Sequence, residues 1–413
     1  MGRYDSKLLG RLGPGILFAG AAIGTSHLVQ STRAGALFGL GFLGVIVLAN
    51  VVKYPAFRIG PLYAAVTGES LLAGYARLGH WVVVLTALGL VPIQAIILAA
   101  TAITSAGIAL ALLNMLLPLG WDAQLVAVSF LVLAVLLARV GGFGLLQALT
   151  KFFIATLTIT TLLATILALP EVRWDWTLEP LHSMEVGVFL FAVAVMGFMP
   201  AGIDLALIQS LWTLEKRSER ALSVREVAFD FHVGYIGSAL LAVCFMLMGA
   251  GVMAPEGVVP ATAAPAFAAQ VLGLYTSTLG EWSGVVVGIS ALAVMFSTLL
   301  AVVDGMPRVQ AACLQAARRR DRPVNLLAVT LGLVGIAALV LLFFMSSFAG
   351  FIDFVTTTTF LVGPLIALLN HLVMTRAPVP VSHRLQGVHW YASGFGIGTM
   401  SVIAIAYFYF YFF

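Results

Sequence analysis

The sequence predicts an all-α membrane protein with about eleven transmembrane helices, arranged as two inverted repeats of five helices and one extra helix. Of its 413 residues, 61% are hydrophobic and only 9% are charged, whereas soluble domains carry roughly 25% charged residues. Apolar stretches of about 20 residues, the length that crosses the hydrocarbon core, recur along the chain. Two of these stretches are interrupted near their middle, at corresponding positions of the two repeats.

The order of the apolar stretches defines the expected organisation. They cover residues 13–38, 42–60, 81–117, 122–139, 145–169, 186–213, 228–252, 283–305, 323–346, 349–375 and 387–413. A short amphipathic segment at 68–77 follows the second stretch, and a long loop with a short helix at 265–273 follows the seventh. We expect one transmembrane domain over 1–413, with repeat one at about 13–169, repeat two at about 186–375 and the extra helix at 387–413.

The basic residues predict the orientation, because lysine and arginine favour cytoplasmic loops. With a cytoplasmic N-terminus and alternating helices, all 21 basic residues except Arg33 and Arg173 fall on the cytoplasmic side, including Lys53 and the cluster at 318–322. The C-terminus then lies outside, and we expect a bacterial inner (plasma) membrane. The first stretch is longer than the apolar core of a signal peptide and has no obvious cleavage site, so we expect it to be retained.

The two interrupted stretches predict the substrate site. Glycine and proline in mid-membrane free backbone groups, which persist in lipid only where they line a cavity or bind a ligand. Matched interruptions in the two halves of a chain are the best sequence indication of a transporter's binding site, although ordinary kinks are the alternative. The candidate residues are Gly24, Thr25, Ser26 and His27 in the first stretch, Met199, Pro200, Ala201 and Gly202 in the sixth, and Asp204 one turn further on.

Several short motifs resemble the Nramp family of proton-coupled divalent metal transporters. They are Gly13-Pro14-Gly15, Ala34-Gly35-Ala36, Arg58-Ile59-Gly60, Val66-Thr67-Gly68 and Met199-Pro200. The resemblance extends over nearly the whole chain. It implies the LeuT fold, which agrees with the five-plus-five inverted repeat and its broken helices one and six.

The chain departs from this family where the family binds metal. The family's helix-one motif DPGN supplies an Asp and an Asn ligand, and this chain has Gly24 and His27 in their places. The family's MPH in helix six is Met199-Pro200-Ala201 here. The stretch at 81–117 lacks the acidic residues of the family's proton route. In helix ten, where the family has a Gln near the metal, this chain has a run of four threonines that includes Thr357. The resemblance therefore implies a divergent member without the usual metal-binding residues.

The remaining ionisable groups have functional and structural readings. A histidine titrates near neutral pH, so His27 is a candidate substrate or proton ligand, or else a structural hydrogen-bonding group. Asp204 is an intramembrane carboxylate, which is a functional hypothesis by default, with a structural ion pair as the alternative. The candidate gating or coupling residues are Arg33, Asp230, His232, Asp304, Arg308 and Asp353. Solvated or structural roles are the alternative for these residues.

These features favour a secondary active transporter that works by alternating access on a small anion, such as bicarbonate, or a polar solute. Half-helix N-termini attract anions, and Gly24 carries no opposing charge. The alternative is a proton-coupled Mg²⁺ or Mn²⁺ transporter with a rebuilt site of His27, Met199 and Asp204; a non-transporting sensor ranks third. We expect no enzymatic activity, no cofactor and no nucleic-acid partner. The expected partners are the small ion or solute, the lipid bilayer and a coupling proton or sodium ion.

Overall fold

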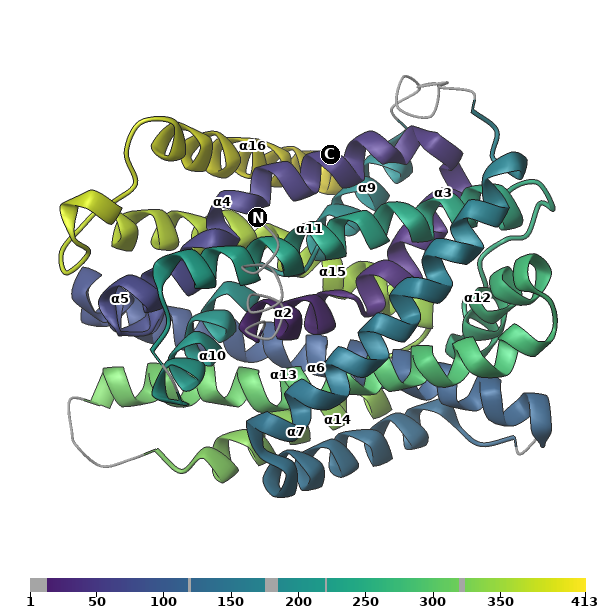
Figure 1. The fold of residues 1–413 in the computed structure, drawn as a ribbon, viewed down its shortest axis with the longest axis horizontal. Helices are drawn as coiled ribbons and strands as arrows, with labels where there is room; N and C mark the ends of the chain where they lie inside the picture. Colours follow the sequence, from purple (N-terminus) through teal and green to yellow (C-terminus); the bar gives the residue numbers. More distant parts are fainter. Residues whose placement is uncertain (1–12, 118–119, 175–184, 220, 319–323) are drawn as a thin grey trace, which may run out of the picture.

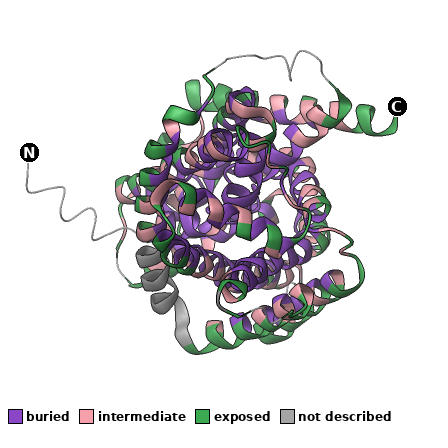
Figure 2. Ribbon diagram, turned by 90° about the vertical axis from the view of Figure 1, so that its right-hand side faces the viewer, coloured by how far each residue is buried: buried purple, intermediate pink, exposed green. Residues whose placement is uncertain are grey.

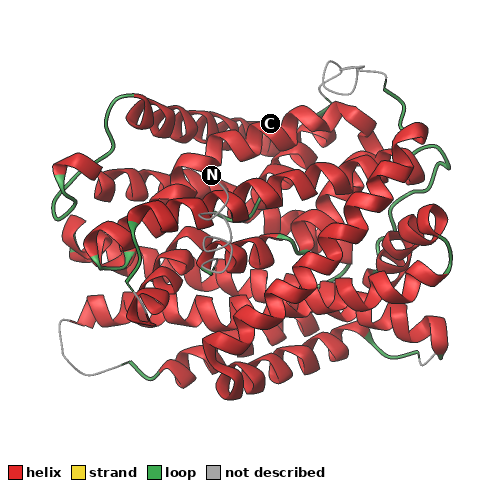
Figure 3. Cartoon of the chain, in the orientation of Figure 1, coloured by secondary structure: helices red, strands yellow, loops and turns green. Residues whose placement is uncertain are grey.

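The computed structural model describes residues 13–117, 120–174, 185–219, 221–318 and 324–413, without the side chains of 116 and 141–153. Within these ranges every regular element is a helix (Figure 3). The basic residues at 1–12 and 319–323, which contribute to the predicted orientation, lie outside the described residues. The fold class predicted from the sequence, an all-α membrane protein with broken helices one and six, is confirmed.

Helix one is broken where the sequence predicts it. It consists of α2 (Pro14–Ala22), a π-helical turn η1 (Ser26–Ser31) and α3 (Thr32–Phe38). Helix six consists of α9 (Val186–Phe198) and α10 (Leu205–Glu219). Pro200 cannot donate a backbone hydrogen bond and Gly202 has no side chain, so the residues between α9 and α10 do not continue the helix.

The other elements of the first repeat follow in chain order (Figure 1). They are η2 (Gly39–Phe42), α4 (Leu43–Thr67), α5 (Leu71–Leu78), α6 (His80–Leu116), α7 (Ala123–Ala168) and η3 (Leu169–Glu171). Those of the second repeat and the C-terminal region are α11 (Val224–Met248), η4 (Gly249–Met253), α12 (Ala264–Leu279), α13 (Trp282–Arg318), α14 (Leu326–Phe343), α15 (Phe348–Met374), η5 (Val381–His383) and α16 (Val388–Phe412).

Several boundaries differ from the prediction. α7 covers all but the first residue of the predicted stretch 122–139 and all but the last of 145–169, and its ribbon doubles back in Figure 1. Two candidate membrane spans lie within this region, Ala123–Val140 and Ile154–Glu171. α12 is longer than the predicted short helix at 265–273, and α4 and α13 extend beyond 42–60 and 283–305. Apolar runs indicate the part of a helix inside the membrane, whereas the helix itself continues through the polar residues at its ends.

The distribution of apolar residues is that of an integral membrane protein. Among the described residues, nine segments are long and apolar enough to cross a membrane. Large apolar side chains are exposed on the outside of the bundle, such as Leu136 (58%), Ile166 (60%) and Phe343 (73%). Buried residues gather in the middle of the bundle and exposed ones on its outside (Figure 2). Because the outer surface is apolar, the surrounding medium must be lipid rather than water.

Small residues let the broken helices pack closely against their neighbours. A Cβ atom on Gly234 of α11 would lie 2.0 Å from the carbonyl oxygen of Gly15 in α2, and one on Gly15 would lie 1.9 Å from the carbonyl oxygen of Asp230. At the end of α9, a Cβ atom on Gly197 would lie 1.9 Å from the carbonyl oxygen of Thr356 in α15. These backbone-to-backbone contacts, which only glycine permits, fix the positions of helices one and six.

Candidate substrate site

A small cavity lies between the two broken helices. Its volume is about 40 Å³, which is room for a few water molecules or one small solute. Its walls come from helix one, helix six, α6 and α13. The polar residues among those that line it are Thr25, Ser26, Thr101, Asp204 and Thr298, and the other lining residues are apolar or glycine.

Hydroxyl groups satisfy backbone carbonyls at the break in helix one. Thr298 of α13 donates to the carbonyl oxygen of Gly20 over 2.5 Å, and Ser26 donates to that of Ala22. Thr25 donates to the hydroxyl of Thr104 in α6 over 3.1 Å. These carbonyls therefore have partners within the protein, and the break can persist in an apolar environment without a bound ligand.

His27 lies beside this break but is not among the residues that line the cavity. Its side chain is fully buried. Nδ1 lies 2.6 Å from the hydroxyl of Ser26, and Nε2 lies 2.8 Å from the backbone carbonyl oxygen of Ser238 in α11. Because that carbonyl can only accept, Nε2 carries a proton and donates it. The hydroxyl of Ser26 has one proton, so it donates either to Nδ1 or to the carbonyl of Ala22. The imidazole therefore joins helix one to α11, and its role as a substrate ligand stays a prediction.

Asp204 lines the cavity from helix six and is 4% exposed. It stands immediately before α10, where a negative charge is stabilised by the helix dipole. A Cβ atom on Gly202 would lie 2.4 Å from Oδ1 of Asp204 and 2.5 Å from Cγ2 of Thr359, so glycine is required for the carboxylate to reach this position. The N-terminus of the second half of helix six is thus already supplied with a negative group by the chain itself.

Lys53 is the functional candidate that the sequence analysis missed. The charge pattern places it at the cytoplasmic side, but the structure buries it, 1% exposed, against the break in helix six. Its ammonium group donates to three backbone carbonyl oxygens, those of Met196 at 2.5 Å, Gly197 at 2.7 Å and Ala201 at 2.9 Å, and interacts electrostatically with Asp204. A lysine inside an apolar stretch was the signal that could have identified it.

The structure brings together only part of the predicted substrate site. Thr25, Ser26, Ala201, Gly202 and Asp204 line the cavity, whereas Gly24, His27, Met199, Pro200 and Thr357 are not among its lining residues. The sulfur of Met199 accepts a hydrogen bond over 3.6 Å from Ser31, which belongs to the second half of helix one. Gly24 faces Thr298, whose Cγ2 would lie 3.1 Å from an added Cβ.

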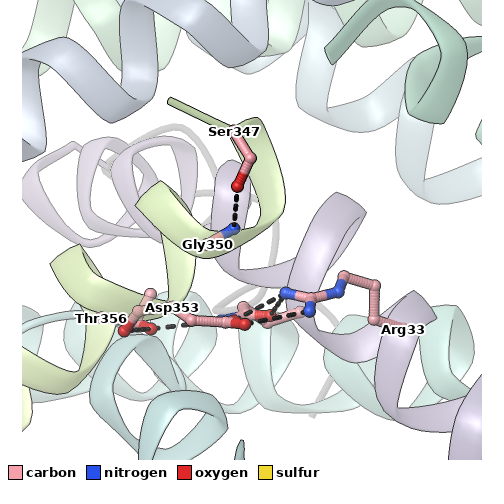
Figure 4. Close-up of polar contacts among 6 residues, drawn as sticks. Arg33, Ser347, Gly350, Asp353 and Thr356 are labelled. Atoms are coloured by element: carbon pink, nitrogen blue, oxygen red, sulfur yellow. Dashed lines mark hydrogen bonds and ion pairs between the residues drawn. The ribbon is translucent and has the colours of Figure 1, made fainter. Parts of the chain in front are cut away.

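Arg33 and Asp353, two of the predicted gating residues, lie together. The guanidinium of Arg33 in α3 makes two hydrogen bonds to the carboxylate of Asp353 in α15 (Figure 4). Gln30 supports the pair, because its amide nitrogen donates to Asp353 over 2.9 Å and its oxygen accepts from Arg33 over 2.9 Å. Gln30 was also missed by the sequence analysis, because its partner Asp353 is 323 residues away in the chain.

The other predicted gating residues do not form one cluster. Asp230 of α11 accepts hydrogen bonds from the backbone nitrogens of Gly13 and Gly15, over 2.9 and 2.7 Å, and so fixes the start of α2. His232 forms a 2.7 Å hydrogen bond with Tyr54 of α4. Arg308 pairs with Asp304 on its own helix at 2.9 Å and with Glu215 of α10 at 3.6 Å.

The described residues contain no group of three or more His, Cys, Asp or Glu side chains that could hold a metal ion. Of the alternative metal ligands, only Asp204 lines the cavity, since His27 and Met199 bond to Ser238 and Ser31 instead. The cavity therefore offers a metal ion one carboxylate and several hydroxyls.

The fold and the cavity between its two broken helices define the class of protein: a LeuT-fold integral membrane protein. A mutant of the Eremococcus coleocola manganese transporter superimposes with a TM-score of 0.69 over 98% of this chain and 87% of its own, at 14% identity. MhsT in complex with L-phenylalanine superimposes with a TM-score of 0.65 over 97% of this chain and 98% of its own, at 15% identity. At these identities the likeness shows the fold alone.

One relative shows the family. The uncharacterized protein PM0681 of Pasteurella multocida (strain Pm70) is 33% identical over 404 residues, which are 94% of this chain and 89% of that protein. The chain belongs to the same family as PM0681. No protein-family model matches the sequence.

Proposed function

We propose that the protein is a secondary active transporter that moves a small polar solute across the membrane by alternating access. The observation that carries this proposal is the small cavity between the breaks of helices one and six. Mid-membrane sites at discontinuous helices are where transporters of such repeated folds bind their substrates. The hydroxyls of Thr25, Ser26 and Thr298 and the carboxylate of Asp204 supply hydrogen-bonding groups for a solute of this size.

The charges around helix six favour an uncharged or zwitterionic polar solute over a bicarbonate-like anion. The N-terminal end of α10 is supplied with a negative charge by Asp204, and the C-terminal end of α9 with a positive charge by Lys53. Among the described residues that line the cavity, none is basic, so an anion would meet the Asp204 carboxylate without a facing cation. The solute's hydroxyl, amide or ammonium groups would instead donate to that carboxylate.

A divalent cation is the second candidate substrate, because the ionisable side chain that lines the cavity is a carboxylate. Mg²⁺ retains several of its water molecules and binds through one or two carboxylates, which makes it less demanding than a fully dehydrated ion. The Nramp resemblance also points to a cation. The single carboxylate is the reason that this candidate ranks behind a polar solute.

The orientation is part of the proposal. With the N-terminus in the cytoplasm and the C-terminus outside, the Arg33–Asp353 pair closes the outer side of the cavity and Asp230 holds α2 on the inner side. A cytoplasm-specific reporter fused after Phe413 tests this arrangement. The proposal expects no reporter activity in a bacterial inner membrane, and strong activity would contradict it.

The central experiment combines flux with accessibility. Purified protein in proteoliposomes is screened for uptake of small polar solutes, bicarbonate, Mg²⁺ and Mn²⁺ under imposed pH and sodium gradients. A sensor on this fold would bind a ligand and carry no flux.

In a background with Cys244→Ala and Cys313→Ala, the variant Ala201→Cys places a thiol in the cavity wall. The control is Ala206→Cys, which is fully buried on the same helix outside the cavity lining.

Membrane-impermeant thiol reagents are then applied from each side. We expect Ala201→Cys to react from either side, with the transported solute protecting it, and Ala206→Cys to stay unreactive. Reaction from one side only under every gradient and solute condition would contradict alternating access.

A further inference from the structure

The surroundings of the Lys53 ammonium have the composition of a cation site. Its three donors meet three backbone carbonyl oxygens at 2.5, 2.7 and 2.9 Å, so each N–H has one acceptor. Two of these carbonyls, those of Met196 and Gly197, belong to the last turn of α9, and the third, that of Ala201, belongs to the unwound segment. Carbonyls at the C-terminal end of a half-helix and in unwound backbone are the groups with which broken-helix transporters coordinate sodium.

We propose that the carbonyls of Met196, Gly197 and Ala201 form a monovalent cation site, which the chain fills with its own lysine ammonium. The C-terminal end of α9 carries the negative end of the helix dipole, and Asp204 adds a nearby negative charge, so a cation is favoured here. Lys53 of α4 supplies that cation as the ammonium group of its fully buried side chain.

The two carbonyls of α9, those of Met196 and Gly197, are held in place independently of Lys53. The last turn of α9 packs against α15 so closely that a Cβ atom on Gly197 would lie 1.9 Å from the carbonyl oxygen of Thr356. Removal of the lysine side chain therefore leaves the two α9 oxygens in position beside an empty space. A free cation of suitable size can then replace the ammonium. If Lys53 were only a structural hydrogen-bonding group, the carbonyls would bind no free cation in its absence.

The site also bears on the coupling ion. The Lys53 side chain occupies the space at the C-terminal end of α9 that a sodium ion would need, which favours a proton over sodium as the coupling ion at this position. This consequence rests on the transport function proposed above, whereas the cation site itself does not.

The experiment measures thermal unfolding of the purified full chain in detergent. The variants are Lys53→Ala, which empties the site, Lys53→Met, which fills the space without a charge, and Lys216→Ala, which removes a partly exposed lysine paired with Glu219. Choline chloride is replaced stepwise by sodium, potassium, methylammonium or ethylammonium chloride at constant ionic strength. The readout is the unfolding temperature, so no substrate is needed, and a failure of the transport proposal does not affect the result.

We expect Lys53→Ala to unfold on the order of 5 °C or more below wild type in choline. A saturable recovery of at least half of this difference in sodium or a small alkylammonium ion would support the site. Wild type, Lys53→Met and Lys216→Ala should not distinguish these cations from choline. The proposal is overturned if Lys53→Ala unfolds at the same temperature in all salts, or if Lys53→Met recovers equally.

Folding itself provides the second measurement if Lys53→Ala does not survive purification in choline. The variant is then solubilised in each salt, and the yield of monodisperse protein is compared. A yield several-fold higher in sodium or ethylammonium than in choline supports the proposal, and equal yields in all salts overturn it.

Discussion

Arg33 and Asp353 form a two-pronged ion pair that joins helix one to α15, with Nη1 2.6 Å from Oδ1 and Nη2 3.0 Å from Oδ2. The guanidinium also lies over the ring of Phe191 in α9, 5.0 Å from its centroid. Planar, doubly bonded pairs of this kind are stronger and more specific in geometry than single contacts. The pair thus connects three of the elements that must separate if the cavity opens on this side.

The first prediction concerns this pair as a gate. Arg33→Gln removes both charged hydrogen bonds, so the conformation open on this side should become more populated. We expect a several-fold faster reaction of Ala201→Cys with an impermeant thiol reagent applied from the Arg33 side. Arg308→Gln, which breaks the pairs with Asp304 and Glu215, is the control and should not increase labelling from that side. An unchanged rate in Arg33→Gln would show that the pair does not close the cavity.

The second prediction concerns the close contact between α2 and α11. Gly234→Ala would place a methyl group 2.0 Å from the carbonyl oxygen of Gly15, which forces the two backbones apart. We expect a loss of about 3 kcal/mol or more in the free energy of unfolding, at the upper end of overpacking effects. Gly237→Ala, on the same helix with nothing within 4 Å of the added methyl group, should stay within about 1 kcal/mol of wild type. Similar stabilities for the two variants, measured by denaturant titration in detergent, would contradict the packing argument.

The helix breaks could be predicted from the sequence, and the contents of the site only in part. Glycine and proline act on the backbone locally, so the interruptions around Gly24 and Pro200 are visible without knowledge of the neighbouring helices. The direction of a side chain depends on which helix packs beside it. The contact between the sulfur of Met199 and Ser31 of helix one therefore cannot be inferred from the sequence, and the role of Met199 in the site stays a prediction.

Lys53 illustrates the same limit for charge. The positive-inside rule assigns basic residues to the cytoplasm, and it holds for residues that end in water. The ammonium of Lys53 instead donates to three carbonyl oxygens that the break in helix six leaves free. These hydrogen bonds replace those to water, and they form only because α4 and α9 lie side by side. Partners distant in sequence cannot be inferred from one sequence alone. The same reason explains why the support that Gln30 gives to Arg33 and Asp353 was missed.

The third prediction concerns Asp204. Asp204→Asn keeps the size of the side chain and its ability to accept hydrogen bonds, but removes the charge that faces the cavity. We expect at least a tenfold loss of transport with a near-normal yield of folded protein, because an intramembrane carboxylate in a cavity wall is a functional group. Asp122→Asn, at the exposed N-cap of α7 outside the cavity lining, is the matched control and should transport normally. Full transport by Asp204→Asn would show that transport does not require this carboxylate.

The last prediction separates the two readings of His27. The sequence interpretation makes His27 a substrate ligand, so that His27→Ala should impair transport and leave folding intact. The structure favours a different outcome, because Nε2 donates to the backbone carbonyl of Ser238 and Nδ1 is bonded to Ser26. Removal of the ring leaves that buried carbonyl without a donor and opens a void, which together should lower the free energy of unfolding by about 2–4 kcal/mol.

Two variants measured side by side decide between these readings. His27→Gln retains an N–H that can reach Ser238, so it should recover part of the stability lost in His27→Ala. Transport per folded molecule should then stay within about twofold of wild type in both variants, a small effect compared with the tenfold steps that removal of a catalytic or binding group produces. If His27→Gln is as stable as wild type and yet inactive, the imidazole takes part in binding or proton transfer, and its bond to Ser238 positions it for that role.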